Sequence, residues 1–442
     1  MRPALRLAPL VLVLPIAADT PGQPPTEALL RGEPAATAKT CAERAIALGR
    51  VKAEAQVLRG RALAAGGNRG EAEEAFTLAM HLAPREPETF TGIARGYLRL
   101  GDRRAAQAAL DAAEATHPMS PAPCRLAAQV WREIGDLEPV RPLAEKALRF
   151  AAKDAAAAAE FAVDLLDMGL AKEAFAIMEV AHPREPKDWE ICTAFATACL
   201  RARRPKDAEL WFQRGILARP KEAKPRRAMI EGYVEHGTRE DCAAARTALQ
   251  DALERAFPPK ERDSQALALM GHLHLLLGER DKAEGRFRES VMHKDAGAEA
   301  FRLIGHAWMK AGFEAEALRA YEVVATGKGT GSFMGIGPGG IWGIDFAKLN
   351  RKQALMDAAQ DLAAQGYKEK ALALAEEAYL LGPEDFENMV ALGKVCLQKG
   401  WQAEGARFLA LGGRKGFQDR DYWVAAGNAL LDTLPSPAAP RP

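Results

Sequence analysis

The sequence predicts an all-α fold, an α-solenoid of about ten repeated helix-turn-helix units. Small residues, glycine and proline recur with a spacing of 34 residues, as Pro84 and Pro118 illustrate. No window shows the sustained β-branched alternation that is typical of strands. The length of 442 residues also exceeds what one ordinary compact core holds, which favours an elongated array.

The repeated unit is clearest between residues 53 and 86. Counting Ala53 as the first residue, the eighth is Gly60, the twentieth Ala72, the twenty-fourth Phe76 and the thirty-second Pro84. Small residues at the eighth and twentieth positions let two antiparallel helices cross closely, and larger residues fill the space around them. A glycine near the fifteenth position ends the first helix, and a proline near the thirty-second ends the second. Each helix pair leaves an apolar face that the next unit must cover.

This pattern resembles the tetratricopeptide repeat (TPR), and the resemblance implies a right-handed superhelical α-solenoid. The register gives ten units, which begin at residues 53, 87, 121, 155, 189, 223, 264, 298, 352 and 386. The unit that begins at 223 carries an insertion of roughly three residues near Glu240. Residues 27–50 fit an additional second helix before the first unit. Residues 422–432 fit a lone first helix, which we expect to cap the array.

Both ends of the chain and one internal segment lie outside the repeats. Residues 1–18 combine a basic start, an apolar run and small residues, which is the pattern of a secretory signal peptide. We therefore expect an exported protein, periplasmic or secreted; the alternative is a disordered start of a cytoplasmic protein. After a linker at 19–26, we expect the array at 27–325, a glycine-rich apolar loop at 326–350, two more units with the capping helix at 351–434, and a disordered tail at 435–442. No other apolar stretch is long enough to span a bilayer, so after signal cleavage we expect no integral membrane protein.

Composition and motifs argue against catalysis and against nucleic acid. The 60 Lys and Arg residues balance the 59 Asp and Glu residues, so no overall positive field would attract nucleic acid. The six cysteines form no C-x-x-C pair and recur at core positions, which is typical of small buried hydrophobic residues. The chain has no H-E-x-x-H or G-x-S-x-G motif. We expect no enzyme activity, no cofactor and no metal site.

The resemblance places the second, fifth, ninth and twelfth positions of each unit on a concave groove that binds partners. In this sequence the residues at those positions include Arg61, Arg95, Arg125 and Arg132 in the first units, and His272 and His306 farther along. First helices of adjacent units lie roughly 10 Å apart, so Arg61, Arg95 and Arg125 predict a basic ladder for carboxylates or an acidic peptide. The alternative is a solvated face with local Glu partners. His272 and His306 hold the same position in successive units, but a metal would need a further ligand.

The glycine-rich loop is the second candidate site. It carries Phe333 and Trp342 among other large apolar residues. Such residues either pack on the body of the protein or are exposed for a partner, with Trp342 as the anchor. The sequence thus predicts a non-enzymatic scaffold that binds a protein or peptide in its groove, in the bacterial cell envelope. The alternative is an accessory or regulatory subunit of an enzyme or polysaccharide-secretion complex on another chain.

Overall fold

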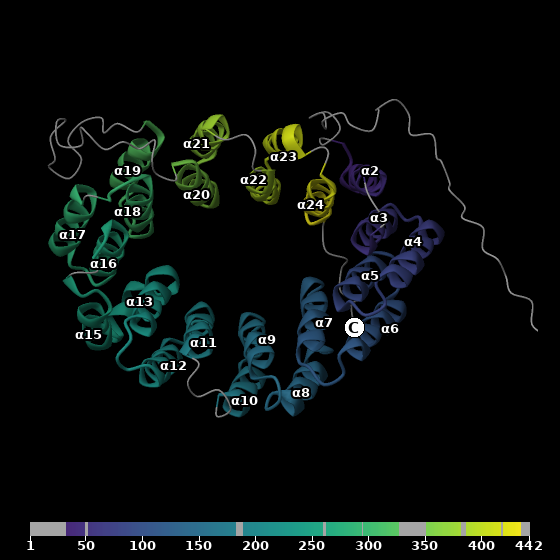
Figure 1. Cartoon of the computed structure of the whole chain (residues 1–442), viewed down its shortest axis with the longest axis horizontal. Helices are drawn as coiled ribbons and strands as arrows, with labels where there is room; N and C mark the ends of the chain where they lie inside the picture. The colour runs from purple at the N-terminus through teal and green to yellow at the C-terminus, as the bar shows by residue number, and fades with distance from the viewer. Residues whose placement is uncertain are drawn as a thin grey trace, which may run out of the picture.

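The computed structural model describes residues 32–48, 52–182, 189–259, 262–293, 295–326, 351–381, 386–416 and 419–434. These residues form 23 α-helices and no strand, arranged as an inner and an outer layer around a ring (Figure 1). The inner layer consists of α3 (Ala53–Ala65), α5 (Pro87–Arg99), α7 (Ala122–Glu133), α9 (Ala155–Asp167), α11 (Trp189–Arg201), α13 (Lys224–His236), α16 (Ser264–Leu276), α18 (Ala298–Lys310), α20 (Arg351–Ala364), α22 (Phe386–Gln398) and α24 (Arg420–Leu431). The outer layer consists of α2 (Pro34–Ala47), α4 (Arg69–Leu82), α6 (Arg103–Thr116), α8 (Val140–Phe150), α10 (Ala171–Ala181), α12 (Pro205–Ala218), α14 (Arg239–Ala244), α15 (Arg246–Ala256), α17 (Arg280–Met292), α19 (Glu314–Thr326), α21 (Lys368–Leu381) and α23 (Gln402–Gly416).

The expected fold class is confirmed, because the expected units are helix pairs packed against one another, with a divided second helix in the unit that begins at 223. The first helix of most units ends at a residue in the left-handed region, where glycine has no Cβ penalty. Gly101 and Gly135, 34 residues apart, have φ values of 73° and 76°. In the unit that begins at 189 the same place is held by Arg203, with a φ of 58°. The 34-residue period is therefore a period of backbone conformation as well as of sequence.

The small residues of the repeat permit close helix crossings. Phe76 on α4 is fully buried between Gly60 on α3 and Gly96 on α5. A Cβ atom on either glycine would lie 2.2 Å from a carbon of the Phe76 ring. The ring of one unit thus fills the space left by glycines of two successive inner helices, which fixes the distance between units.

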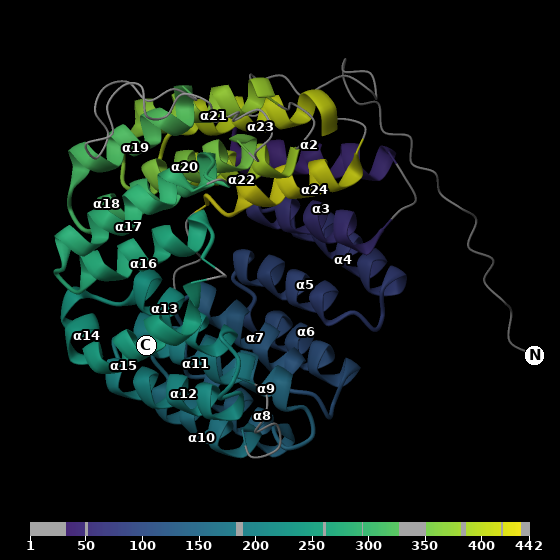
Figure 2. The ribbon, with the colours of Figure 1, turned by 60° about the vertical axis from the view of Figure 1, so that its left-hand side comes forward.

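The solenoid closes on itself. The inner helix α24, from the C-terminal end, packs against α2 from the N-terminal end and also contacts α3 (Figures 1 and 2). Tyr422 and Trp423 of α24 share a buried apolar cluster with Cys41 and Ala45 of α2, and the Arg44 guanidinium lies 4.7 Å from the Trp423 ring centroid. A Cβ on Gly427 would lie 3.2 Å from the Cβ of Cys41. The expected capping helix at 422–432 is present as α24, and it packs against α2 from the other end of the array.

The closing pair is itself a repeat divided between the chain ends. Gly427 occupies the eighth position counted from Arg420, where Gly60 stands in the first unit. In α2, Ala38 and Ala42 correspond to Ala72 and Phe76 of the first unit. Each lies as many residues before the start of α3 as its counterpart lies before the start of α5. Helix α24 thus supplies the first helix of an eleventh unit, and α2 supplies the second. The ring has no open end among the helices that the structure describes.

The insertion near Glu240 divides the second helix of its unit. Helices α14 and α15 take the place of one outer helix and meet at Ala245. Thr238 and Asp241 form a reciprocal capping box at the start of α14, each side chain accepting a hydrogen bond from the other residue's backbone N–H. The extra residues are accommodated at this break, so the following unit regains its register.

All six cysteines are buried as free thiols, in agreement with their place at core positions. Among the described helices, none is long and apolar enough to cross a membrane. The expected signal peptide and linker at 1–26, the glycine-rich loop from 327 onward and the tail at 435–442 lie outside the described residues.

Candidate binding surface inside the ring

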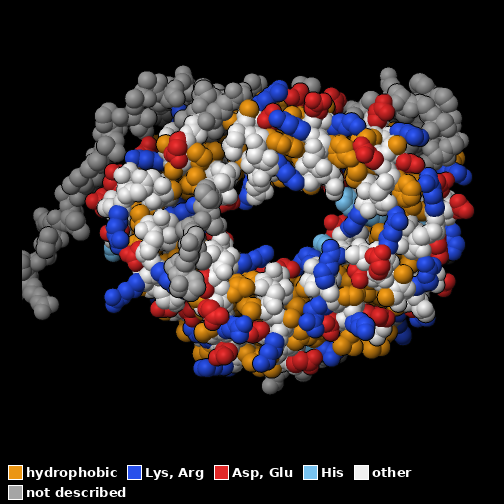
Figure 3. All heavy atoms as spheres, turned by 180° about the vertical axis from the view of Figure 1, so that it is seen from behind, with side chains coloured by type: hydrophobic (Ala, Val, Ile, Leu, Met, Phe, Trp, Pro, Cys, Tyr) orange, Lys and Arg blue, Asp and Glu red, His pale blue; other side chains and the backbone are white. Residues whose placement is uncertain are grey.

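The inner helices surround an opening through the middle of the molecule. Figure 3 shows this opening bordered by charged side chains of both signs and by histidine. The opening, rather than an open concave groove, is therefore the surface on which the resemblance places a partner. The charge that this surface offers a partner depends on the ion pairs between neighbouring inner helices.

In the first half of the ring, arginines of the expected basic ladder form ion pairs with the next inner helix. Arg95 on α5 donates two hydrogen bonds of 2.8 and 2.7 Å to the carboxylate of Glu133, at the end of α7. Arg125 on α7 donates to Asp164 on α9 at 2.7 Å and also pairs with Glu160. Each pair joins two units, so these guanidinium groups are largely neutralised where they stand. This arrangement is the one expected for a solvated face with local carboxylate partners.

Arg61 lies in a different environment, beside the junction that closes the ring. Its guanidinium donates to the side-chain oxygen of Asn428 on α24 at 2.7 Å, and the Asp432 carboxylate is 3.9 Å away. Burial, and next the neighbouring Arg95 guanidinium, lower the pKa of Arg61. The structure therefore brings Arg61 and Arg95 together, with Arg99 beside them, while Arg125 belongs to the separate α7–α9 contact. Arg132 is exposed on α7.

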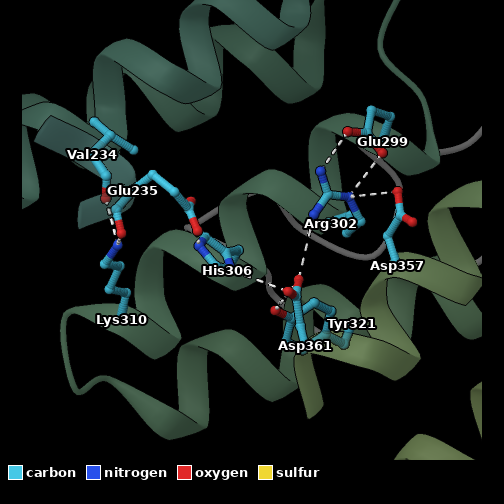
Figure 4. Close-up of polar contacts among 9 residues, drawn as sticks. All are labelled: Val234, Glu235, Glu299, Arg302, His306, Lys310, Tyr321, Asp357 and Asp361. Atoms are coloured by element: carbon cyan, nitrogen blue, oxygen red, sulfur yellow. Dashed lines mark hydrogen bonds and ion pairs between the residues drawn. The ribbon is translucent and has the colours of Figure 1, made fainter. Parts of the chain in front are cut away.

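On the opposite side of the ring, His306 on α18 connects three inner helices (Figure 4). Its Nδ1 lies 3.4 Å from the Asp361 carboxylate on α20, and its Nε2 lies 3.5 Å from the Glu235 carboxylate on α13. The Asp361 and Glu235 carboxylates raise the pKa of His306 to about 9. The His306 imidazolium in turn lowers the pKa of Glu235 to about 2. The imidazole is thus a cation at neutral pH and holds two carboxylates on separate helices.

Arg302 and Lys310, one turn away on either side of His306, extend this network. The Arg302 guanidinium donates to Glu299 at 2.7 Å and lies 3.4 Å from the Asp361 carboxylate (Figure 4). The Lys310 ammonium donates to the carbonyl oxygens of Val234, at 2.7 Å, and of Glu235. These are terminal carbonyls of α13, which otherwise have no intrahelical partner, so Lys310 on α18 caps the C-terminal end of α13.

His272 does not reach the opening, and the expectation that it contacts a partner needs correction. It is 3% exposed on α16, which lies between α13 and α18. Glu235, His306 and Lys310 join those two helices across the inward side of α16, and the His272 and His306 ring centroids are 5.8 Å apart. Burial and the charge on His306 hold the pKa of His272 well below its ordinary value. His272 is therefore a neutral core residue.

The arrangement does not favour metal chemistry. Within the described residues, no group of three or more His, Cys, Asp or Glu side chains is placed to hold a metal ion. A protonated His306 has no lone pair to offer a metal, because both ring nitrogens carry protons. The other candidate residues, Phe333 and Trp342, lie outside the described residues.

A further set of charged inner-helix residues could have been identified from the sequence. They hold the thirteenth position of their units, which is not among the expected groove positions. The thirteenth residue of successive units is charged in the run Arg99, Glu133, Asp167, Arg201 and Glu235, each 34 residues after the last. Arg201 and Asp167 form a bidentate pair at 2.8 and 3.0 Å. The thirteenth position lies at the C-terminal end of the inner helix, where these side chains meet those of the neighbouring unit. Charged residues of both signs that recur at a 34-residue spacing are the signal that would have identified them.

Comparison with known proteins adds little to these observations. No family model matches the chain, and no curated protein matches it in sequence. Solved structures with similar helix arrangements include PilF of Pseudomonas aeruginosa, with 16% identity, 46% of this chain and 89% of that chain covered, and a TM-score of 0.26. A monomeric IFIT1 mutant with Gppp-AAAA has 15% identity, 89% and 96% coverage and a TM-score of 0.29. The P58(IPK) TPR domain has 16% identity, 78% and 99% coverage and a TM-score of 0.18. The assignment of the fold rests on the helix pairs of this chain itself.

Proposed function

We propose that the chain is a non-enzymatic scaffold that binds a protein or peptide partner at the opening of the ring. The observation that carries this proposal is the closed inner layer, whose charged side chains border an opening through the molecule (Figure 3). The ion pairs on this surface are between helices and partly exposed: the side chain of Glu133 is 50% exposed and that of Glu160 is 62% exposed. Partly exposed pairs of this kind are individually weak, so a partner's charged groups can exchange with them.

Site-specific photo-crosslinking tests where a partner binds. A photoreactive residue at Arg132, exposed on the inner helix α7, should give covalent adducts with the partner in cells that make the full chain. The matched control is the same residue at Leu217, which is 75% exposed on the outer helix α12. Adducts from the Leu217 position alone would contradict binding at the opening. An enzyme subunit recovered through Arg132 would support the role of an accessory subunit.

We also propose that the protein is exported to the bacterial cell envelope. The support is the basic, then apolar, then small-residue order of residues 1–18. N-terminal sequencing of the protein from its own cells tests this, since export predicts a start near residue 19. A chain that retains Met1 would count against export and leave the binding proposal untouched.

A further inference from the structure

A cavity of about 290 Å³ lies where the first and last units of the helical array meet. We call it the seam cavity. One side is formed by Arg61 on α3 and by Arg95 and Arg99 on α5; the other is formed by Leu431 and Asp432 at the end of α24. No unit of the array makes this cavity alone, because its walls come from residues more than 300 positions apart in the sequence.

The polar side of the seam cavity has more positive than negative charge. Three guanidinium groups line it against two carboxylates, those of Glu133 and Asp432. Glu133 is held bidentately by Arg95, and Asp432 accepts a hydrogen bond of 2.8 Å from Lys394, so a fourth cation shares the same carboxylates.

The Arg61 guanidinium has little compensation for its burial. Its side chain is only 19% exposed, its described hydrogen bond is to the neutral amide of Asn428, and the nearest carboxylate oxygen is 3.9 Å away. A nearly enclosed guanidinium without a close carboxylate is unfavourable, and an anion in the cavity would relieve that cost.

The remaining lining of the seam cavity is mostly aliphatic, with the side-chain amide of Gln398 as one further polar group. Leu98 and Ile134 contribute from the N-terminal half of the chain, and Leu431 and Leu434 from the C-terminal end. These leucine and isoleucine side chains favour a short hydrocarbon segment. The volume suits a molecule of small size, below the usual range of drug-sized sites.

We propose that the seam cavity binds a small organic carboxylate with a short aliphatic group, and that the bound molecule strengthens closure of the ring. The carboxylate lies against Arg61 and Arg99, and the aliphatic group lies against Leu98 and Leu431. This inference goes beyond the scaffold function and does not depend on it, since it concerns a small molecule and a site distinct from the rest of the opening. Because both chain ends form the walls, a ligand that binds only the closed ring must stabilise that state by linkage.

Isothermal titration calorimetry of the full chain with 4-methylpentanoate is the first test. We expect saturable binding, with acetate weaker by about tenfold or more because it lacks the aliphatic group, and no binding of the neutral 4-methylpentanamide. Arg61→Met and, at the rim, Arg99→Gln should each weaken binding by about tenfold or more, the effect of losing one charge-assisted contact. Arg132→Gln, which changes an inner-face arginine outside the cavity, should leave binding within twofold.

Hydrogen exchange measured on the same samples tests the effect on closure. Saturating 4-methylpentanoate should slow amide exchange in α2 and α24 of the wild-type chain and leave α11, on the far side, unchanged. Circular dichroism and the exchange of α11 show that each variant is folded. Three outcomes would overturn the assigned site. They are the absence of saturable binding, equal binding of the amide, and an Arg132→Gln effect as large as that of Arg99→Gln. Binding without protection of α2 and α24 would overturn the link to closure.

Discussion

Phe76 shows how a single position determines the spacing of the units. Its ring occupies the space that a Cβ would take on either Gly60 or Gly96, and all three residues are buried in consecutive inner and outer helices. The sequence predicted Gly60 as the small residue of its unit. It did not predict that Gly96, two residues beyond the expected small position of the next unit, also contacts the Phe76 ring. That contact depends on the rotation between units, which a repeat pattern does not encode.

Replacing Gly60 by Ala should destabilise the protein by about 1–2 kcal/mol. Overpacking costs about 1–3 kcal/mol, and the better helix propensity of alanine recovers up to about 1 kcal/mol. Gly285→Ala is the matched control, because Gly285 lies inside α17 with nothing within 4 Å of its missing Cβ. It should stabilise by about 0.5–1 kcal/mol. Denaturant titration of both variants measures the difference, and a neutral Gly60→Ala would show that Phe76 has room to shift.

Arg203 should be a source of strain that glycine removes. Non-glycine residues in the left-handed region cost roughly 1–2 kcal/mol, and the unit before it uses Gly169, with a φ of 79°, at the same place. Arg203→Gly should therefore stabilise by about 1 kcal/mol after the greater unfolded-state entropy of glycine is included. Gly169→Ala should destabilise by a similar amount in the same thermal denaturation series. Two changes of the same sign would refute this account.

At the scale of helices, the surroundings of α16 are what the sequence predicts least well. Position counting places His272 on the inner surface, yet α13 and α18 are joined across α16 by Glu235, His306 and Lys310. The curvature that brings α13 and α18 together is a property of three consecutive units, not of one. The periodic pattern correctly gave the existence of these helices, because small and large core residues recur with it. It could not give which charged residues of separate units approach one another.

Stability should depend on pH through His306. Its folded pKa of about 9 is above its ordinary value of 6.5, so its contribution is complete below pH 6.5 and is lost as the pH rises through about 9. A shift of this size, reduced for partial exposure, corresponds to about 2 kcal/mol. The groups that face it are Glu235, Asp361, Lys310 and His272. Glu235, whose pKa is lowered to about 2, is ionised throughout this range, and His272 is neutral.

The comparison with His306→Gln isolates this contribution from other groups that titrate in alkali. Between pH 7 and pH 10 the free energy of unfolding of the wild-type chain should fall by about 2 kcal/mol more than that of the variant. Equal losses in the two proteins would show that the Glu235–His306–Asp361 contacts add nothing to stability.

At the scale of the whole molecule, closure of the ring is the feature that the sequence left undetected. The sequence did show a lone second helix at 27–50 and a lone first helix at 422–432, which are complementary halves of one unit. Their pairing depends on the sum of small rotations over ten units returning α24 to α2. An error of a few degrees per unit would leave an open superhelix with the same residues, so local patterns do not decide between the two forms.

Trp423→Ala should open the ring without unfolding the array. Trp423 is buried against α2, and truncating a buried tryptophan costs about 3–5 kcal/mol, which falls on the α2–α24 junction. We expect faster amide exchange in α2 and α24 and a larger radius of gyration in small-angle scattering. Trp211→Ala is the control, because Trp211 is equally buried but lies in the middle of the array on α12. It should loosen its own unit and leave α2 and α24 protected; if it opens the junction equally, closure is not a local property of Trp423.

The divided eleventh unit means that the order of units is cyclic while the order of residues is linear. The break in the cycle of described helices, between α24 and α2, lies inside a unit instead of between two units. A circularly permuted gene that starts at Ala53, joins α24 to α2 through a flexible connection and ends after α2 would encode the same ring with every unit uninterrupted. Such a permuted protein should fold to the same dimensions in small-angle scattering and resist opening by Trp423→Ala better than the natural chain order, because the two halves of the junction become neighbours in sequence.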